Sequence, residues 1–475
     1  MSFLWTSDAL VAATGGRPFG TMPAGITGIS IDTRSLKPGD AFFAIKGDVH
    51  DGHDFATAAV HAGATLLVVA EGKLPALGRL SVPMIVVSDV LAALEKTGIA
   101  ARDRARGKII AVTGSVGKTT TKEALRHALS AVGTVHASDK SFNNHWGVPL
   151  TLAKLPEDAD FGIFEIGMNH PGEIRPLVKM VRPHVAIVTL IAPAHLGHFR
   201  DLEEIAQAKA EIFEGVVEGG HAVLNRDDPH FDLLEKLARA AGVGDVVGFG
   251  EDERADFRLL DVRLDADGSS VRARIGGQEM DVRVGAPGRH IVQNALAVLG
   301  AAHLAGADLA KVSAALADLT PESGRGKRHI LQHPEGRIVL IDESYNANPA
   351  SMKAAIALLQ SSPLEGEGRR IAVLGDMLEL GSHAAALHAG LADALDGTDL
   401  VLLAGPEMKA LADRLAGERP VEYRDDAEAL KPLLIDTARA GDTVMIKSSK
   451  GIGFSKLVDA LLKHYPAGTG EGAAA

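Results

Sequence analysis

Residues 108–125, KIIAVTGSVGKTTTKEAL, are the stretch that most constrains the fold of this chain. An apolar run leads into a glycine-rich turn, and an apolar stripe that includes Leu125 and Leu129 continues beyond it at helical spacing. A strand, a turn and a helix in this order place backbone N–H groups at a helix N-terminus, where an anion is favoured. The stretch therefore predicts a phosphate-binding loop. The alternative is a plain strand–helix turn with an exposed lysine.

The loop departs from the commonest phosphate-loop pattern, G-x-x-x-x-G-K-[ST], at one position. The first glycine of that pattern is replaced by Val112. The rest of the pattern still predicts that Lys118 reaches the β- and γ-phosphates of a nucleotide and that the Thr119 hydroxyl contacts Mg²⁺. We predict that the nucleotide is held by Thr113, Gly114, Ser115, Val116, Gly117, Lys118, Thr119 and Thr120.

The composition is that of a globular protein with several domains. At 475 residues the chain is too long for one hydrophobic core, and 46% apolar with 23% charged residues is ordinary for such proteins. The net charge of −12 argues against a nucleic-acid partner. The absence of cysteine excludes disulfides, thiolate metal sites and cysteine nucleophiles. The first residues show no signal-peptide pattern and no apolar run is long enough to cross a membrane, so we expect a cytoplasmic protein without membrane insertion.

Three blocks of alternating strand and helix patterns predict an α/β protein of three domains. Short strands and turns fill residues 1–103, and residues 104–317 carry the phosphate loop and further apolar strands typical of a parallel sheet. Within that second block, residues 255–286 switch to period-two alternation, which indicates antiparallel strands. Residues 318–475 read as a Rossmann-like domain that ends in a disordered tail, PAGTGEGAAA.

Polar residues at strand ends are the candidates for metal binding. Glu165 follows the apolar strand FGIFEIG, where α/β sheets place their ligands, and it suits a Mg²⁺ ligand or, alternatively, a helix cap. His195 follows the next strand, although a lone histidine is more often a structural hydrogen bonder. Lys209 lies beside the apolar face of the helix EEIAQAKAEIFEGV, and this position alone indicates a lysine that extends its amine toward solvent.

The third block offers a second group of polar residues. Asp342, Tyr345, Asn346 and Asn348 lie between a strand and a helix, where they either clamp a ribose or purine or simply form an Asx-turn and a helix cap. The basic cluster GRGKRH, residues 324–329, either supplies a charge to a γ-phosphate across a domain cleft or is a solvated linker.

Taken together, the motifs resemble the Mur ligase family over nearly the whole chain. SIDTRSLKPGDAFFAIKGDVHDGHDF is similar to the UDP-binding N-terminal domain of these enzymes, and TGSVGKTTTKE is similar to their ATP loop, T-G-x-x-G-K-T-[TS]. In that loop the missing first glycine is the family's own pattern. NNHWGVPLTL, EIGMNHPGEI, KAEIF, DESYNANPASM and LGDMLELG resemble the MurF branch most closely.

The resemblance implies a role for each matching residue. The catalytic set is Lys118, Glu165, His195, Lys209 and Arg325. The metal ligands are Thr119, Glu165, His195 and Lys209, with two Mg²⁺ ions expected and Lys209 carried as a carbamate. Further nucleotide contacts fall to Asn294, Arg325, Asp342, Tyr345, Asn346 and Asn348. The UDP-sugar substrate is expected at Ser30, Asp32, Thr33, Arg34, Lys46, Gly47, Asn143 and Asn144.

The implied activity is an ATP-dependent ligation. The terminal carboxylate of UDP-N-acetylmuramoyl-tripeptide becomes an acyl phosphate, which the amine of D-alanyl-D-alanine attacks, and the enzyme is expected to act as a monomer. Two departures affect local contacts: Ile291 replaces an asparagine of G-x-H-N-x-x-N, and His145-Trp146 replaces smaller residues. The alternatives are diamino-acid addition as in MurE, folylpolyglutamate synthesis, and a nucleotide switch without ligase activity.

Overall fold

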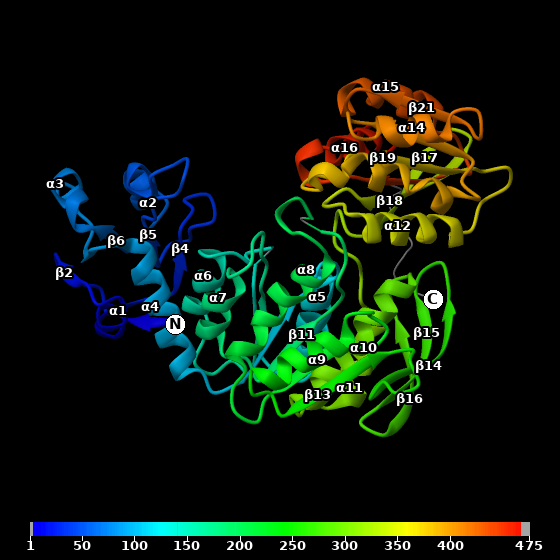
Figure 1. Ribbon diagram of the computed structural model, residues 1–475. Coiled ribbons are helices and arrows are strands. Elements are labelled where there is room, and N and C mark those ends of the chain that lie inside the picture. Colours follow the sequence, from blue (N-terminus) through cyan, green and yellow to red (C-terminus); the bar gives the residue numbers. More distant parts are fainter. Residues whose placement is uncertain (1–2, 140, 195, 467–475) are drawn as a thin grey trace.

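The computed structural model describes residues 3–139, 141–194 and 196–466. Figure 1 shows three α/β units that follow one another along the chain, coloured blue, cyan to green, and yellow to red. Each unit is built on its own sheet, and the first unit also has the small pair β1 (Trp5–Thr6) and β3 (Gly25–Ile26). The predicted sequence of three α/β blocks is therefore present, while the tail at 467–475 lies outside the described residues.

The first unit contains a five-stranded sheet of order β2-β7-β6-β5-β4, parallel except for β2. Its strands are β2 (Arg17–Phe19), β4 (Gly28–Ser30), β5 (Asp40–Phe43), β6 (Leu66–Ala70) and β7 (Met84–Val87). Its helices are α1 (Ser7–Thr14), α2 (Ala56–His61), α3 (Leu74–Leu77) and α4 (Val90–Arg104). The central strands are fully buried, which explains their continuous Leu and Val runs.

The middle unit contains a nine-stranded sheet of order β16-β15-β14-β13-β12-β11-β8-β10-β9. The strands are β8 (Lys108–Thr113), β9 (Val135–Ala137), β10 (Phe161–Glu165), β11 (Val185–Val188), β12 (His221–Asn225), β13 (Asp245–Gly250), β14 (Phe257–Leu264), β15 (Ser269–Ile275) and β16 (Gln278–Val284). The strands from β8 to β14 pair in parallel, and β14, β15 and β16 form the antiparallel set predicted from the period-two pattern.

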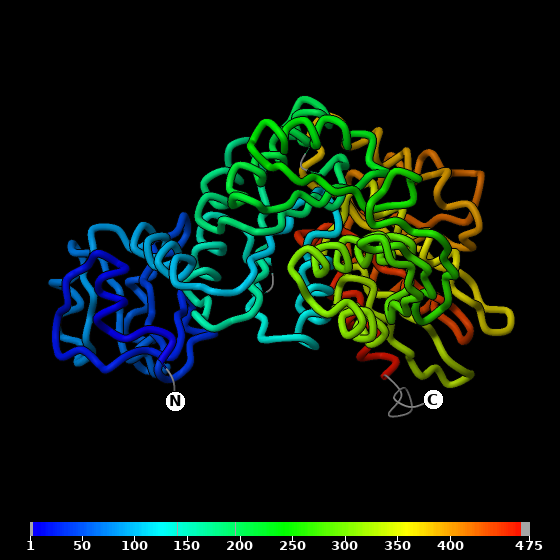
Figure 2. Tube along the Cα trace, turned by 90° about the horizontal axis from the view of Figure 1, so that it is seen from below, coloured from blue at the N-terminus to red at the C-terminus, as the bar shows by residue number. Residues whose placement is uncertain are grey.

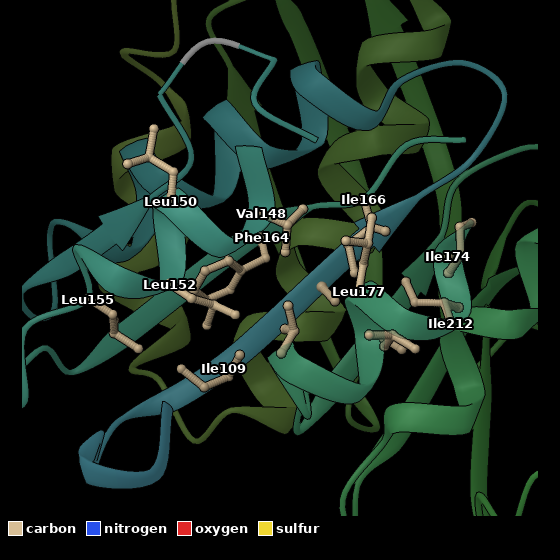
Figure 3. Close-up of a cluster of buried hydrophobic side chains, with 14 of the residues drawn as sticks. Ile109, Val148, Leu150, Leu152, Leu155, Phe164, Ile166, Ile174, Leu177 and Ile212 are labelled. Atoms are coloured by element: carbon tan, nitrogen blue, oxygen red, sulfur yellow. The ribbon is translucent and has the colours of Figure 1, made fainter. Parts of the chain in front are cut away.

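Helices cover both faces of this sheet. They are α5 (Lys118–Leu129), α6 (Gly147–Ala153), α7 (Ile174–Val181), α8 (Leu202–Ala210), α9 (Phe231–Ala240), α10 (Arg289–Leu304) and α11 (Leu309–Leu316). Alternate residues of β8 belong to opposite cores: Ile109 packs with α6 and α7, while Ile110 packs with α5 and α10. Figure 3 shows the first of these cores, with Ile109, Phe164 and Leu177 among its labelled side chains.

The C-terminal unit contains a six-stranded sheet of order β17-β18-β22-β19-β20-β21, parallel except for β17. Its strands are β17 (Lys327–His333), β18 (Gly336–Glu343), β19 (Arg370–Gly375), β20 (Leu400–Ala404), β21 (Val421–Arg424) and β22 (Thr443–Lys447). Its helices are α12 (Pro349–Ser361), α13 (Ala384–Ala389), α14 (Lys409–Leu415), α15 (Ala427–Thr437) and α16 (Ser455–His464). The second half of the basic cluster GRGKRH belongs to β17, so these residues are not a free linker.

As far as the chain is described, the first unit packs on the middle unit and not on the C-terminal unit (Figure 1 and Figure 2). The indole Nε1 of Trp5 donates to the carbonyl of Ala153 at 2.9 Å, and the Arg104 guanidinium lies 3.6 Å from the centre of the Trp5 ring. Buried residues of both units form one continuous hydrophobic core. Among the described residues, no helix combines the length and apolar character that crossing a membrane requires.

Candidate active site

A cavity of about 450 Å³ lies where the middle and C-terminal units face each other. The phosphate loop, the end of β10 and helix α10 form its middle-unit side. The residues before β17, the end of β18, the loop after it and the end of β22 form the opposite side. A cavity at the carboxyl ends of parallel strands is the usual ligand position in α/β proteins.

The phosphate loop needs its two glycines for identifiable reasons. Gly114 (φ 146°) and Gly117 (φ 86°) have backbone conformations that other residues rarely adopt. A Cβ on Gly117 would lie 2.8 Å from the Asn294 side chain, and one on Gly114 would collide with Thr189. By contrast, Val112 is an interior strand residue paired with Glu165 and with β11, so nothing there requires glycine.

The loop residues lie close to the predicted phosphate position. Residues 115–120 line the cavity, whereas Thr113 and Gly114 lie behind it. The Ser115 hydroxyl is buried without a hydrogen-bond partner in the described part of the chain, which leaves it available to a ligand. Helix α5 begins at Lys118, so the loop N–H groups lie at a helix N-terminus and suit a phosphate.

Lys118 is half-buried in the cavity wall. Its Nζ donates to the carbonyl of Gly114 at 2.6 Å. Burial lowers the pKa of Lys118, and the nearby Arg325 charge lowers it further, while Glu165 opposes this shift. A phosphate between Lys118 and Arg325 would relieve this unfavourable environment, because it supplies the missing negative charge.

Glu165 is 1% exposed and ends strand β10. Its carboxylate accepts from Thr119 Oγ1 at 2.8 Å and from Asn143 Nδ2 at 2.7 Å. A hydroxyl and a carboxylate in contact at a phosphate site are the oxygen donors that Mg²⁺ prefers. Within residues 3–139, 141–194 and 196–466, no cluster of three or more His, Asp or Glu side chains forms a complete metal site. The predicted ligand His195 lies outside the described residues.

Lys209 is buried rather than extended toward solvent, so the prediction from helix position alone is wrong. It is 2% exposed, and its amine has no hydrogen-bond or ion-pair partner among the described residues. Burial lowers its pKa well below the usual value, and the charge of Lys118 adds to the shift. Burial therefore disfavours the protonated form of this amine, which lies close enough to Lys118 of the phosphate loop to feel its charge.

Arg325 and Tyr345 come from the C-terminal unit to the same cavity. The Arg325 guanidinium lies 4.2 Å from the centre of the Tyr345 ring, and the Tyr345 hydroxyl hydrogen-bonds Ser141 Oγ of the middle unit at 2.9 Å. Asp342 does not line the cavity. Its carboxylate accepts from Ser323 Oγ and from the Gly324 backbone at 2.9 and 2.7 Å, so it fixes the turn that presents Arg325.

The sequence left two roles open for the asparagines, contact with the ligand or capping of a turn or helix, and the structure contains examples of both. Asn348 caps α12, where its Oδ1 accepts from the Ser351 backbone at 2.9 Å, and it also lines the cavity. Asn294 and Asn346 line the cavity as well. Asn144 Oδ1 accepts from the backbone of Gly147, the first residue of α6, at 3.0 Å, and Asn144 does not line the cavity.

The predicted substrate residues of the first unit are not brought to this cavity. Asp32 and Arg34 form an exposed ion pair at 2.6 Å, and the Ser30 hydroxyl bonds the backbone of Asp32. Lys46 and Gly47 lie in a neighbouring loop. Thr33 lies between the ion-paired residues, and of the predicted substrate set only Asn143 lines the cavity.

Sequence reasoning missed several cavity residues. Lys447 Nζ donates to Glu343 Oε2 and to the carbonyl of Asn346, each at 3.0 Å. His290 also lines the cavity, and burial lowers its pKa. Glu343 and Lys447 are the last residues of β18 and β22, a position that could have marked them as candidates.

Comparisons with known proteins agree with this arrangement. Residues 25–102 match the Mur ligase family catalytic domain, residues 112–302 the Mur ligase middle domain, and residues 328–450 the Mur ligase glutamate ligase domain. The UDP-N-acetylmuramoyl-tripeptide–D-alanyl-D-alanine ligase of Rickettsia prowazekii is 32% identical over 91% of this chain and 94% of its own length.

Two solved structures share the fold. MurF from Acinetobacter baumannii has a TM-score of 0.84 at 29% identity and covers 97% of this chain and 99% of its own. MurF from Thermotoga maritima in complex with ADP has a TM-score of 0.74 at 26% identity and covers 92% and 97%. The predicted three-domain α/β architecture is thus confirmed, and the chain belongs to the Mur ligase family.

Proposed function

We propose that this protein is the ATP-dependent ligase that joins D-alanyl-D-alanine to UDP-N-acetylmuramoyl-tripeptide. The names of its relatives support this substrate pair. One structural observation carries the proposal: the phosphate loop of the middle unit and Arg325 of the C-terminal unit line the same cavity. A cavity divided between two domains suits a reaction that must bring a nucleotide and two further substrates together.

The chemistry requires positioning more than covalent work by the protein. A carboxylate oxygen of the tripeptide attacks the γ-phosphorus of ATP, and ADP leaves with the bonding electron pair. The amine of the dipeptide then attacks the acyl carbon, an amide forms, and inorganic phosphate leaves as the amine loses its proton. Lys118 and Arg325 provide positive charge where negative charge spreads over the transferred phosphoryl group.

The residues also fit the predicted metal and modification. Thr119 Oγ1 and Glu165, which already lie 2.8 Å apart, would hold a Mg²⁺ ion that neutralises phosphate charge. His195 and a second Mg²⁺ ion complete the proposed metal site. Carbamylation of Lys209 requires a neutral amine, and burial lowers its pKa in that direction. The carbamate would replace an unpaired buried amine by an anion beside Lys118.

The first unit is the proposed site for the UDP-sugar, with Ser30, Asp32, Thr33, Arg34, Lys46 and Gly47 as its contacts. These residues lie on a unit that packs on the middle unit alone, so substrate binding would require this unit to approach the cavity. We propose domain limits of 1–103, 104–317 and 318–475, a monomeric enzyme and a cytoplasmic location.

Phosphate release from ATP tests the function. The assay compares UDP-N-acetylmuramoyl-dipeptide and UDP-N-acetylmuramoyl-tripeptide as donors, each with single amino acids and with D-alanyl-D-alanine as acceptors. We expect release only with the tripeptide and the dipeptide acceptor together. Release with a single amino acid but none with D-alanyl-D-alanine would overturn the proposal, and release without either substrate would indicate a nucleotide switch.

A further inference from the structure

Part of the proposed ATP cavity is formed by the middle unit alone. Strands β11, β12 and β13 are neighbours in the sheet, α10 packs on β12 and β13, and the cavity is lined where these elements meet. The lining residues there are Leu190, Asn225, Phe249, Ile291, Gln293 and Asn294. We call this part the β12–α10 end of the cavity.

The β12–α10 end adjoins the phosphate loop. A Cβ on Gly117 would lie 2.8 Å from the amide oxygen of Asn294. Leu190, Phe249 and Ile291 give this end apolar surface, which the two faces of a purine ring require. A nucleotide whose phosphates lie on the loop therefore finds a suitable place for its base here.

The side-chain amide of Gln293 has a fixed orientation. Its Nε2 donates to Asp227 Oδ2 at 3.0 Å and to Glu251 Oε1 at 3.2 Å. An ionised carboxylate only accepts hydrogen bonds, so the amide oxygen cannot replace the nitrogen on this side. Because nitrogen and oxygen lie on opposite sides of the amide, Gln293 Oε1 is turned away from both carboxylates.

The two carboxylates are themselves held in place. Asp227 accepts from the backbone N–H groups of Glu251 and Asp252 at 2.9 to 3.0 Å. Glu251 accepts from Arg289 Nε at 2.9 Å and from a second nitrogen of the same guanidinium. These hydrogen bonds from Arg289 lower the pKa of Glu251, so the carboxylate is ionised at neutral pH. The orientation of the Gln293 amide is therefore set before any ligand binds.

The amide oxygen of Gln293 lacks a partner. It is buried, and among the residues that the structure describes none donates a hydrogen bond to it. A buried acceptor that stays unpaired is costly, and proteins retain few of them. Since Gln293 lines the proposed ATP cavity, a donor on the bound nucleotide can supply the missing hydrogen bond.

The two purine bases differ in what they offer such an acceptor. Adenine carries an exocyclic amine on C6, which donates, whereas guanine carries a carbonyl oxygen there, which accepts. In the same pose, guanine would place its oxygen against Gln293 Oε1. The fixed amide cannot turn to present its nitrogen instead, so both acceptors would stay unpaired.

We propose that Gln293 is the residue that selects adenine, and that its Oε1 accepts a hydrogen bond from the C6 amine of the base. The apolar residues of the β12–α10 end hold the ring, and Asn294 lies between the base and the phosphate loop. This inference rests on the proposed ligase function and adds the residue that determines which nucleotide is used.

The test compares three nucleotides in phosphate release with the UDP-tripeptide and D-alanyl-D-alanine both present. They are ATP, the triphosphate of purine riboside, which lacks the C6 amine, and GTP. We expect the wild type to favour ATP by about tenfold over the amine-free analogue and by about 10²-fold or more over GTP in kcat/KM. The difference should lie mainly in KM for the nucleotide.

The variants are Gln293→Leu and, as a matched control, Gln278→Leu, which removes an exposed glutamine of β16 outside the cavity. Gln293→Leu should use ATP and the amine-free analogue about equally and should narrow the preference for ATP over GTP at least about tenfold. Gln278→Leu should keep both preferences. Each variant is compared with itself on different nucleotides, so a smaller folded fraction lowers all values equally and leaves their ratios unchanged.

Two outcomes overturn the role of Gln293 while the proposed function stands. One is a wild type that uses ATP and the amine-free analogue equally well, and the other is a Gln293→Leu enzyme that keeps the wild-type ratios. A wild type that releases no phosphate from ATP with both substrates present overturns the proposed function and the inference with it.

Discussion

Ser141 of the middle unit and Tyr345 of the C-terminal unit share a hydrogen bond of 2.9 Å between Oγ and the phenolic oxygen. The Arg325 guanidinium stacks on the same Tyr345 ring, and both residues line the proposed ATP cavity. A second contact joins these units where the Gly197 backbone donates to the carbonyl of Glu379 at 2.9 Å. The orientation of Arg325 is thereby coupled to the docking of two domains.

Tyr345→Phe tests this coupling, because it removes the hydroxyl and keeps the ring under Arg325. We expect kcat/KM for ATP to fall about 3- to 10-fold, since a hydrogen bond of this kind contributes about 1 kcal/mol. Ser141→Ala should give a similar loss and the double variant little more, as steady-state kinetics would show. Tyr423→Phe, on β21, is the matched control. Full additivity of the two losses would contradict a shared interaction.

Lys118→Ala should abolish acyl-phosphate formation without unfolding the protein. The amine makes its described hydrogen bond only to the loop carbonyl of Gly114, and burial already disfavours its charge, so stability depends little on it. We expect phosphate release to fall at least about 10²-fold, the loss typical of removing a preorganised charge at the reacting group. Thermal unfolding followed by circular dichroism checks the fold, with the exposed Lys108→Ala as control. Near-normal ligation by Lys118→Ala would refute the assigned role.

Lys209→Met separates function from stability at the buried amine. The pKa of Lys209 is lowered in the folded protein, so below its unfolded value of 10.5 the unfolded chain binds the proton more tightly and gains relative stability. Replacing Lys209 by an uncharged side chain should therefore leave the free energy of unfolding at pH 7 unchanged or higher in CO₂-free buffer. Ligase activity should nevertheless be lost, because no carbamate can form.

Removal of CO₂ tests the carbamate in the wild-type enzyme. Activity should fall after removal of CO₂ and return with bicarbonate, and ¹³C-labelled bicarbonate should give a carbamate signal in NMR that Lys209→Met lacks. Full activity of Lys209→Met would rule out the carbamate.

The sequence allowed the strand–helix order and the phosphate loop to be predicted because both depend on local patterns. Apolar runs marked β8, β10 and β11, and Gly-Lys-Thr at the start of α5 marked the loop. The burial of Lys209 could not be predicted in this way. One face of α8 packs on the core, and whether the Lys209 amine is buried depends on the neighbouring elements that pack around that helix. The polar turn around Asp342 was ambiguous for a similar reason: the partners of its carboxylate are the side chain of Ser323 and the backbone of Gly324, which local pattern does not reveal.

The ion pair between Lys447 and Glu343 is another feature that could not be predicted from the sequence. These residues are neighbours because β22 inserts between β18 and β19, a crossover that no local pattern specifies. Lys447→Met should lower the free energy of unfolding by about 3 kcal/mol, because it leaves Glu343 with an uncompensated buried charge. Combining it with Glu343→Leu should restore much of that stability in urea unfolding, while activity stays low because the carbonyl of Asn346 loses its donor. Lys463→Met serves as the control on α16, and stability unchanged by Lys447→Met would contradict the pair's role.

His184 should contribute to the pH dependence of the free energy of unfolding. The backbone of Ile109 donates to its Nδ1 at 2.9 Å, and burial together with the charge of Arg102 lowers its pKa from 6.5 to about 4. Between these values the unfolded chain takes up the proton and the folded protein does not, so the free energy of unfolding falls as the pH drops from about 6.5 to about 4. Because the ring is only half-buried, we expect a contribution of about 1–2 kcal/mol. His184→Asn retains an acceptor for Ile109 and should flatten this slope in urea unfolding at several pH values, without a change at pH 7. His61→Asn, at an exposed histidine, should leave the slope intact, and an equal slope in His184→Asn would show that other groups produce it.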